Sequence, residues 1–286
     1  MNNFLKNKHL ISRAGFGIHH NDIEKYKNLS PKKPYQELKN NSEYKVLLTD
    51  FPTVTPEQYL EMSKAQDRKP LNQFNNLYNK NFRKSWHSQM INSPYQLREK
   101  MAFFWHGHFA TRIQHALFNK EIIEIFRKNA LGSFRDLVFD VSKSSAMLNF
   151  LNNQQNKKAK PNENFSRELM ELFTLGRGNL YTEKDIKESA RAFTGWSYNE
   201  LGEFTDNKKQ HDAGEKVFLG RNGNFDGTDI INIILEQPEC AEFITKKIYQ
   251  FFVNDIADEK IVKSLSQKFY KSNYDILTLM DEIFLS

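Results

Sequence analysis

Six imidazole and carboxylate side chains lie in segments that are otherwise apolar or regularly patterned, and these residues are the best suited to chemistry. Imidazole nitrogens and carboxylate oxygens bind divalent metal ions, and the same groups act as general acids and bases. One hypothesis is therefore a divalent metal site with the ligands His106, His108, Glu168 and His211. In this hypothesis the candidate catalytic bases are Glu171 and Asp212.

The histidines of the His106-Gly107-His108 segment can bind one ion together only if Gly107 breaks the helix. Residues two apart point in directions that differ by roughly 200° on a helix, but to the same side of a strand. If the helix continues, His108 joins its apolar face and His106 lies opposite. His108 is then a core histidine whose hydrogen bond goes to a carbonyl or to a carboxylate such as Glu168.

The carboxylates also have a structural interpretation. Buried glutamates need charged partners, so Glu168 and Glu171 would form salt bridges between helices. Candidate partners are Arg13, Arg98, Arg112, Arg167 and Arg191. His211 and Asp212 lie in a predicted loop, where packing explains an imidazole beside a carboxylate less easily. The alternative there is a turn in which Asp212 accepts backbone hydrogen bonds.

The helix predicted over residues 161–176 must position both glutamates. Its apolar residues recur at helical spacing and form one face. That face consists of Phe165, Leu169, Leu172 and Phe173. Glu168 and Glu171 lie on the adjoining face, at the edge of the buried region. Asn162 is the predicted N-cap, and Gly176 is expected to end the helix in a left-handed turn.

Other segments are mostly helical. Ser93 with Gln96 predicts a capping box before the histidine helix, and Thr182 with Asp185 predicts another. Residues 197–227 are rich in Gly, Asn and Asp, so we expect a long loop or small β excursion that carries His211. Residues 32–55 are expected to be irregular, with 43–48 extended, and helical spacing returns over 228–284. The fold class predicted is mainly α, multi-helical and globular.

Four blocks of sequence, in order along the chain, carry a family resemblance. The longest is Asn162-Glu-Asn-Phe-Ser-Arg-Glu-Leu-Met-Glu-Leu-Phe-Thr-Leu-Gly176, with Tyr181-Thr-Glu and Ala190-Arg-Ala-Phe-Thr-Gly-Trp196 after it. The others are His9-Leu-Ile-Ser-Arg-Ala-Gly-Phe-Gly17, Met101-Ala-Phe-Phe-Trp-His-Gly-His-Phe109 and His211-Asp-Ala-Gly-Glu-Lys-Val-Phe-Leu-Gly220. Together these blocks resemble the DUF1800 family of bacterial proteins.

The resemblance implies a single DUF1800-like helical domain over residues 1–286. Members usually continue well beyond the position of Ser286, so the resemblance also implies a truncated C-terminus. The family is uncharacterised, and it supplies no catalytic residues, cofactor or partner that could be transferred to this chain.

Composition and charge limit the function classes. With 39% hydrophobic and 27% charged residues, the chain can bury a sizeable core. The net charge is +6, but the lysines are scattered among acids and asparagines, so a nucleic-acid partner is not expected. We find no apolar run of 18 residues and no signal core near Met1, and expect a soluble cytoplasmic protein without a membrane span. The single cysteine, Cys240, excludes an intramolecular disulfide.

We expect the polar blocks to converge on one buried site between the central helices and the 197–227 loop. Two functions compete for that site. The first is a metal-dependent or acid–base enzyme with hydrolytic or oxidative chemistry. The second is a non-catalytic scaffold or binding protein in which the same residues form a buried polar network. An enzyme requires His211 and Glu168 within several ångströms around a cavity, whereas arginines in that space indicate a scaffold.

Overall fold

The computed structural model describes residues 3–30, 32–40, 43–45, 54–178 and 180–285, and these residues are mainly α-helical. The helices are α1 (Asn3–Ala14), α2 (Ile23–Lys27), α3 (Lys33–Asn40), α4 (Pro56–Lys64), α5 (Lys69–Asn92), α6 (Gln96–His108), α7 (Ala116–Asn129), α8 (Phe134–Lys143), α9 (Ser145–Phe150), α10 (Asn164–Glu168), α11 (Glu183–Ala192), α12 (Gly227–Leu235), α13 (Pro238–Phe252), α14 (Glu259–Lys271) and α15 (Ile276–Leu285). The strands are β1 (Trp196–Tyr198), β2 (Phe204–Asp206), β3 (Lys216–Phe218) and β4 (Arg221–Gly223). The prediction of a mainly α protein is confirmed.

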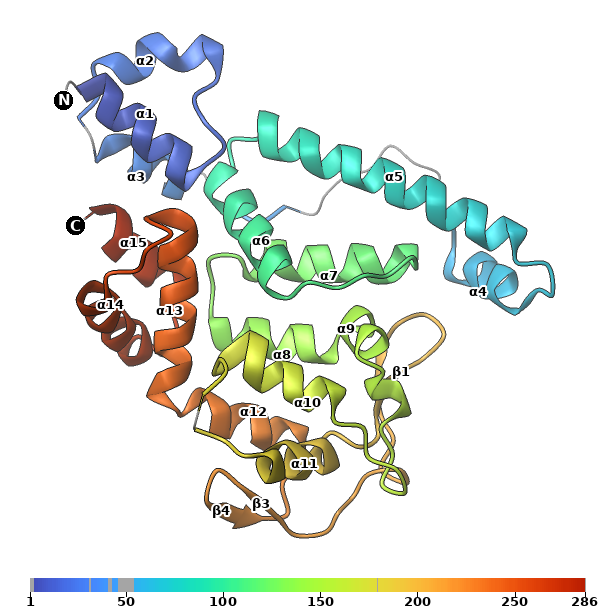
Figure 1. The fold of residues 1–286 in the computed structure, drawn as a ribbon. Coiled ribbons are helices and arrows are strands. Elements are labelled where there is room, and N and C mark those ends of the chain that lie inside the picture. Colours follow the sequence, from blue (N-terminus) through green and yellow to red (C-terminus); the bar gives the residue numbers. More distant parts are fainter. Residues whose placement is uncertain (1–2, 31, 41–42, 46–53, 179, 286) are drawn as a thin grey trace.

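The helices form four groups (Figure 1). α1–α3 lie together at one corner, and the long α5 extends away from them above α6 and α7. α8 to α12 make up the lower body, and α13–α15 form the side that faces α1–α3. That side is joined to α3 by Tyr35, whose hydroxyl donates to Asp281 at 2.9 Å. The first and last helices therefore lie on the same side of the molecule.

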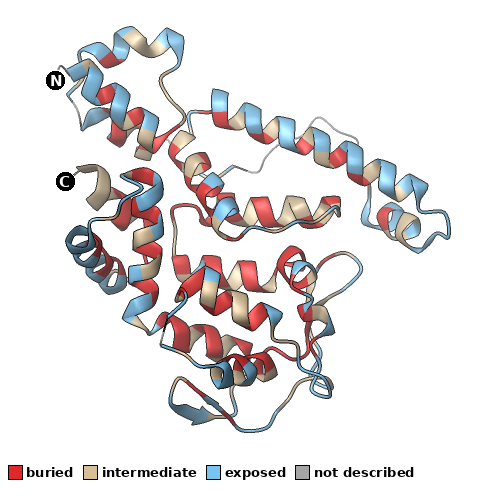
Figure 2. Cartoon of the chain, in the orientation of Figure 1, coloured by how far each residue is buried: buried red, intermediate tan, exposed pale blue. Residues whose placement is uncertain are grey.

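The hydrophobic core lies where α6, α7 and α8 meet α12 and α13. Figure 2 shows buried residues concentrated on these helices, while the outer faces of α5 and α14 are exposed. Trp105, Phe109 and Phe134 are at most 1% exposed. The Trp105 and Phe134 rings lie 5.5 Å apart. Burying such a side chain stabilises the fold by about 1.5–3 kcal/mol, so the histidine-bearing α6 is firmly held by its apolar face.

The helix predicted over 161–176 consists of two parts. α10 is followed by a π-helix, Leu169–Thr174, in which backbone bonds span five residues instead of four. Phe165, Leu169 and Phe173 are buried as predicted, but Leu172 is 46% exposed. The prediction for Leu172 was wrong because the wider π-turn rotates this residue away from the 100° spacing of an α-helix.

The ends of this segment agree partly with the prediction. Gly176 adopts a positive φ of 77°, as a left-handed helix end requires. Asn162 accepts a hydrogen bond from the Asn164 N–H at 3.0 Å, but Glu163 occupies the N-cap position. Asn162 therefore closes a turn just before the helix.

The two predicted capping boxes have different outcomes. Thr182 and Asp185 form the reciprocal capping box at the start of α11. The box at Ser93 is wrong, because the Gln96 side-chain oxygen accepts the Phe16 N–H at 3.2 Å. Ser93 instead accepts from the Tyr95 N–H at 2.9 Å. Gln96 thus ties α6 to the N-terminal helices, a long-range contact that local spacing does not reveal.

The predicted β excursion at 197–227 is confirmed as two short antiparallel hairpins. β1 pairs with β2, with Ser197 opposite Thr205, and β3 pairs with β4, with Val217 opposite Asn222. The first hairpin is preceded by Gly195, whose φ is 88°. A Cβ at Gly195 would lie 2.6 Å from the backbone oxygen of Asn207, so only glycine permits this close approach.

The prediction of an irregular 32–55 segment was wrong over residues 33–40, which form α3. Its apolar face reaches the core through Tyr35 and Leu38, which are 0% and 7% exposed. Half of the extended stretch predicted at 43–48, residues 46–48, lies outside the described residues. None of the described helices is both long enough and apolar enough to cross a membrane.

Candidate functional site

The two histidines of α6 point to different sides of the helix. α6 continues through Gly107 and ends at His108. The His106 ring contacts Trp86 on α5 and Phe126 on α7, with ring centroids 5.4 and 6.3 Å apart. The structure therefore corresponds to the continued-helix interpretation, in which the two imidazoles do not face a common position.

His108 is half-buried and is held by the π-helix. Its Nε2 lies 3.0 Å from the carbonyl oxygen of Phe173. Because a carbonyl only accepts, we assign the proton to Nε2, which leaves Nδ1 as an acceptor in the neutral ring. Burial, together with the charge of Lys247, lowers the pKa of His108 to about 4, although the bond to Phe173 acts in the opposite direction. The imidazole is therefore neutral at pH 7, and the predicted carbonyl partner is present.

A cavity with a volume of about 490 Å³ brings His108 and Glu168 together with Lys247. Its apolar lining includes Phe150 and Leu172, which are 39% and 46% exposed. No residue that the structure describes pairs with the half-buried Glu168 carboxylate. This arrangement, a few convergent polar groups within apolar walls, is typical of small-molecule sites. We call it the His108 cavity.

Glu171 is paired with arginines and does not line the His108 cavity. One carboxylate oxygen lies 3.1 Å from Nε of Arg177, and the other lies 3.6 Å from Nη1 of Arg167. Arg167 is one of the partners proposed from the sequence, and it also pairs with Glu163 and Glu183. Glu171 therefore belongs to a charged network along the central helix.

Asp212 and His211 hold the hairpin region against the end of α11. Asp212 accepts from Nε and Nη2 of Arg191 at 2.7 and 3.2 Å, and this partner lowers the pKa of its carboxyl. Asp212 also accepts the Gly214 N–H at 2.9 Å, the turn that the sequence alternative predicted. His211 Nδ1 lies 3.0 Å from the Thr194 carbonyl oxygen. Neither residue lines the His108 cavity, so the polar blocks do not converge on one site.

The expected metal ligands are therefore distributed over three places. His106 lies beside α5, His108 and Glu168 share a cavity, and His211 lies against α11. In the part of the chain that the structure describes, no three His, Cys, Asp or Glu side chains are grouped so that they could hold a metal ion.

A family model described as "Protein of unknown function (DUF1800)" matches residues 9–286. The chain belongs to the DUF1800 family. The match covers the histidine helix, the central segment and both hairpins. A comparison with curated proteins and a comparison with solved structures each gave no match.

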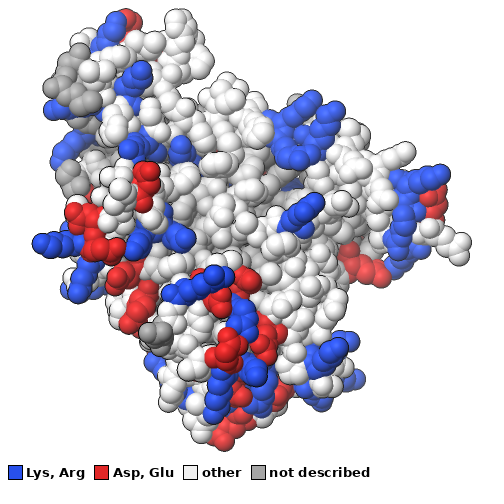
Figure 3. Space-filling view, in the orientation of Figure 1, with Lys and Arg blue, Asp and Glu red and all other residues white. Residues whose placement is uncertain are grey.

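A second cavity of the DUF1800 protein, with a volume of about 460 Å³, lies between α5, α7 and the segment that joins α6 to α7. We call it the α5–α7 groove. Its lining contains Arg83, Arg112, His87 and His106 but no Asp or Glu. Figure 3 shows Lys and Arg atoms over α5 and between α5 and α7, without acidic atoms between them. The groove is therefore positively charged.

Of the residues that line this groove, the sequence predicted a role only for His106 and, as a possible salt-bridge partner, for Arg112. The pattern that marks this groove is a helical face of α5 on which two polar and then two apolar residues recur at spacings of three and four. That face contains Asn79, Arg83, Trp86 and Met90.

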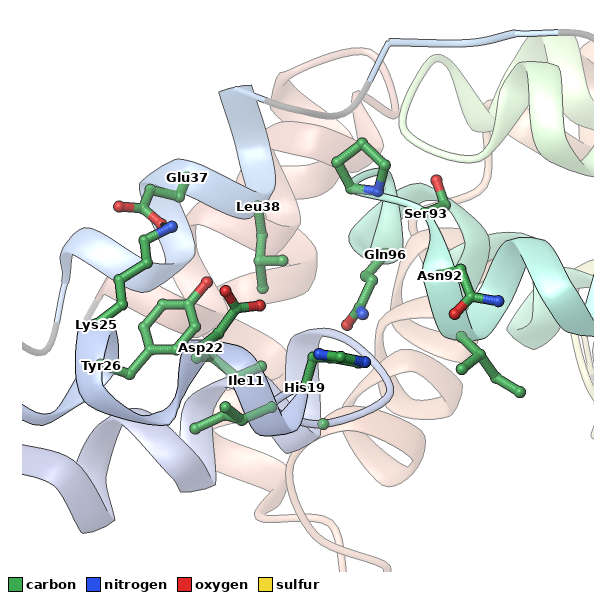
Figure 4. Close-up of a pocket in the computed structure, with 14 residues that line it drawn as sticks. Ile11, His19, Asp22, Lys25, Tyr26, Glu37, Leu38, Asn92, Ser93 and Gln96 are labelled. Carbon is green, nitrogen blue, oxygen red and sulfur yellow. Dashed lines mark ion pairs between the residues drawn. The ribbon is translucent and has the colours of Figure 1, made fainter.

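A third cavity lies between the N-terminal helices and the junction of α5 with α6 (Figure 4). Lys25 and Glu37 form an ion pair at 2.7 Å on one side, and Gln96 lies on the other. His19 and Asp22 also line it. In contrast to the α5–α7 groove, this cavity contains both signs of charge, so it does not favour an anion.

Proposed function

We propose that this DUF1800 protein is a binding protein in which the polar residues of its family-like segments hold the fold together. The observation that carries the proposal is that both candidate catalytic carboxylates, Glu171 and Asp212, are ion-paired with arginines. A general base needs an accessible lone pair and a pKa near the working pH. The Arg191 partner engages both oxygens of Asp212 and lowers its pKa, so Asp212 is poorly suited to that role.

Metal analysis tests this proposal directly. We expect wild-type protein, purified without a metal-affinity step, to contain no stoichiometric divalent metal by inductively coupled plasma mass spectrometry. The His211→Ala/Glu168→Ala double variant should give the same result. The matched control is His20→Ala/Glu24→Ala, which removes the same groups from exposed positions outside the three cavities. About one metal ion per chain, lost in the first variant and kept in the control, would contradict the proposal.

An acid–base enzyme at the His108 cavity is the second candidate. It is favoured by the half-buried Glu168 carboxylate, which lines an apolar cavity beside Lys247 and has no partner among the described residues. Glu168 would act as the base, and the Nδ1 atom of His108 would accept a hydrogen bond from the substrate. The walls Phe150 and Leu172 would contact an apolar part of the substrate.

Hydrolysis of p-nitrophenyl esters with acyl chains of increasing length tests this second candidate. Activity that Glu168→Gln abolishes would favour the enzyme. The matched control is Glu242→Gln, an exposed position on α13 that does not line the cavity. Equal rates in the wild type and both variants would show that the hydrolysis does not take place at Glu168.

A further inference from the structure

We propose that the α5–α7 groove binds a small organic anion, one carboxylate, phosphate or sulfonate group attached to an apolar ring. This inference rests on the proposed binding function and assigns that function a site and a ligand class. The groove encloses about 460 Å³, which lies within the range of about 300–1,000 Å³ typical of small-molecule sites.

The charge of the groove is not balanced by the protein. Arg112 makes no hydrogen bond or ion pair with a described residue. Arg83 uses only Nε, which donates to the Asn79 carbonyl oxygen at 3.2 Å. Its two terminal nitrogens thus remain available for a ligand. By contrast, Arg127 and Arg191 of the same chain are paired with carboxylates at 2.7–2.9 Å.

Guanidinium groups without partners suit an anionic ligand. Their planar donors bind carboxylate and phosphate oxygens in pairs, and such charge-assisted bonds are about twice as strong as neutral ones. Because no Asp or Glu lines the groove, no negatively charged side chain of the lining repels an anion there. His87 and His106 add further ring nitrogens, none of which has a hydrogen-bond partner among the described residues.

The groove is held in shape by an amide network. Asn119 donates to the side-chain oxygen of Asn79 at 3.1 Å and to the Ile113 carbonyl oxygen at 2.7 Å. Asn79 in turn donates to the Gln114 carbonyl oxygen at 2.7 Å. These bonds join α5 and α7 to the segment that carries Arg112. The backbone that carries the two arginines is thus held in place before a ligand binds, which reduces the entropy cost of binding.

Aromatic side chains form the apolar part of the groove. Trp86 is held in place because its Nε1 donates a hydrogen bond to Glu99 at 2.9 Å. Its ring also contacts His106. Phe103, which is 44% exposed, also lines the groove. These contacts favour an anion that carries a ring over an inorganic anion. A polynucleotide would extend well beyond a cavity of this size, so a single small molecule is the better fit.

The test uses the aromatic anion 8-anilinonaphthalene-1-sulfonate, whose fluorescence rises when it enters an apolar site. We expect it to bind the wild type at one site that Arg83 and Arg112 control. Arg83→Gln/Arg112→Gln should weaken binding about tenfold or more, because each arginine loses a charge-assisted bond. The neutral analogue N-phenyl-1-naphthylamine should bind both proteins alike. Phenyl phosphate should displace the dye more effectively than inorganic phosphate.

The matched control is Lys80→Gln/Lys84→Gln, which removes the same charge from exposed positions of the same helix outside the groove. Equal losses in the two double variants would show general electrostatic attraction and overturn the proposal. Dye binding that neither variant changes would place the dye elsewhere and would also overturn it. Binding of a single-stranded oligonucleotide that Arg83→Gln/Arg112→Gln abolishes would replace the proposed ligand class. None of these outcomes depends on metal content, so this inference and the proposed function can fail separately.

Discussion

Replacing Arg127 by methionine is expected to destabilise the protein strongly and in a pH-dependent way. Arg127 and Glu99 are 1% and 0% exposed, and their closest nitrogen and oxygen lie 2.8 Å apart. Arg127 Nε also donates to the second Glu99 oxygen, at 3.0 Å. Without the guanidinium, the buried carboxylate of Glu99 keeps only the Trp86 N–H as a hydrogen-bond donor among the bonds described.

The size of the effect depends on whether the buried Glu99 carboxylate keeps its charge or binds a proton. Removing one partner of a buried ion pair typically costs about 3–5 kcal/mol. The carboxylate can avoid the burial cost by binding a proton, and for a glutamate with a pKa of about 4.3 this costs about 3.7 kcal/mol at pH 7. At pH 5 the same proton costs only about 1 kcal/mol. Arg127→Met should therefore lose about 3–4 kcal/mol at pH 7 and clearly less at pH 5.

The sign agrees with proton linkage. In Arg127→Met the folded state holds a proton on Glu99 that the unfolded state releases above its own pKa, so stability falls as the pH rises. Urea unfolding followed by circular dichroism at pH 5 and pH 7 measures the difference. Glu99→Gln/Arg127→Met removes the charge and should recover most of the pH 7 loss. The control Lys246→Met, at the exposed surface pair with Glu259, should lose about 1 kcal/mol or less.

An equal loss at both pH values, or a double variant as unstable as Arg127→Met, would refute the assignment of Glu99 as a buried charge. The first result would indicate that packing around the arginine, rather than charge, controls stability. The second would indicate that the Glu99 side chain tolerates the absence of its partner.

Two further predictions concern a pair of glycines and one histidine. Gly107→Ala should raise the free energy of unfolding by about 0.5–1 kcal/mol, because Gly107 lies in a helix with open space at its Cβ position. Gly195→Ala should lower it by about 1–3 kcal/mol through strain at positive φ and a clash with Asn207, and both variants can be compared by urea unfolding. Burial holds the pKa of His108 at about 4, so the unfolded state binds more protons below pH 6.5 and stability falls as the pH drops. His108→Gln should lose less stability than the wild type between pH 6.5 and pH 4.5, and equal losses would contradict this reasoning.

Sequence patterns predicted the ends of helices correctly where the interacting residues lie close together in the sequence. Thr182 and Asp185 form their capping box because both partners lie within one helical turn. Gly176 could be placed at a helix end because its conformation is a property of that residue. Gln96 had the same kind of signal as Asp185, but its side chain bonds to Phe16, 80 residues earlier in the chain. Sequence spacing cannot choose between a local and a distant partner of equal hydrogen-bonding capacity.

The candidate site was predicted less well because charge pairing depends on the tertiary structure. The sequence placed Glu168 and Glu171 on one helix face with the same prospects for an arginine partner. In the structure Glu171 pairs with Arg167 and Arg177, whereas Glu168, three residues earlier, lines a cavity with Lys247. The π-helix that begins at residue 169 separates their surroundings, and no spacing rule for α-helices anticipates it.

The same reasoning explains why the α5–α7 groove was not selected from the sequence. A net charge of +6 predicted a solvated surface, because the lysines of the whole chain are scattered among acids and asparagines, although Glu99 is the only acidic residue between Asp67 and Glu121. In the folded chain the acids Glu99 and Glu124 both pair with Arg127. Acidic side chains that could have neutralised the charge of the groove are thus paired with the buried guanidinium of Arg127. The groove is therefore basic for two reasons: the segments that line it contain almost no acidic residues, and the fold pairs the acids Glu99 and Glu124 with Arg127.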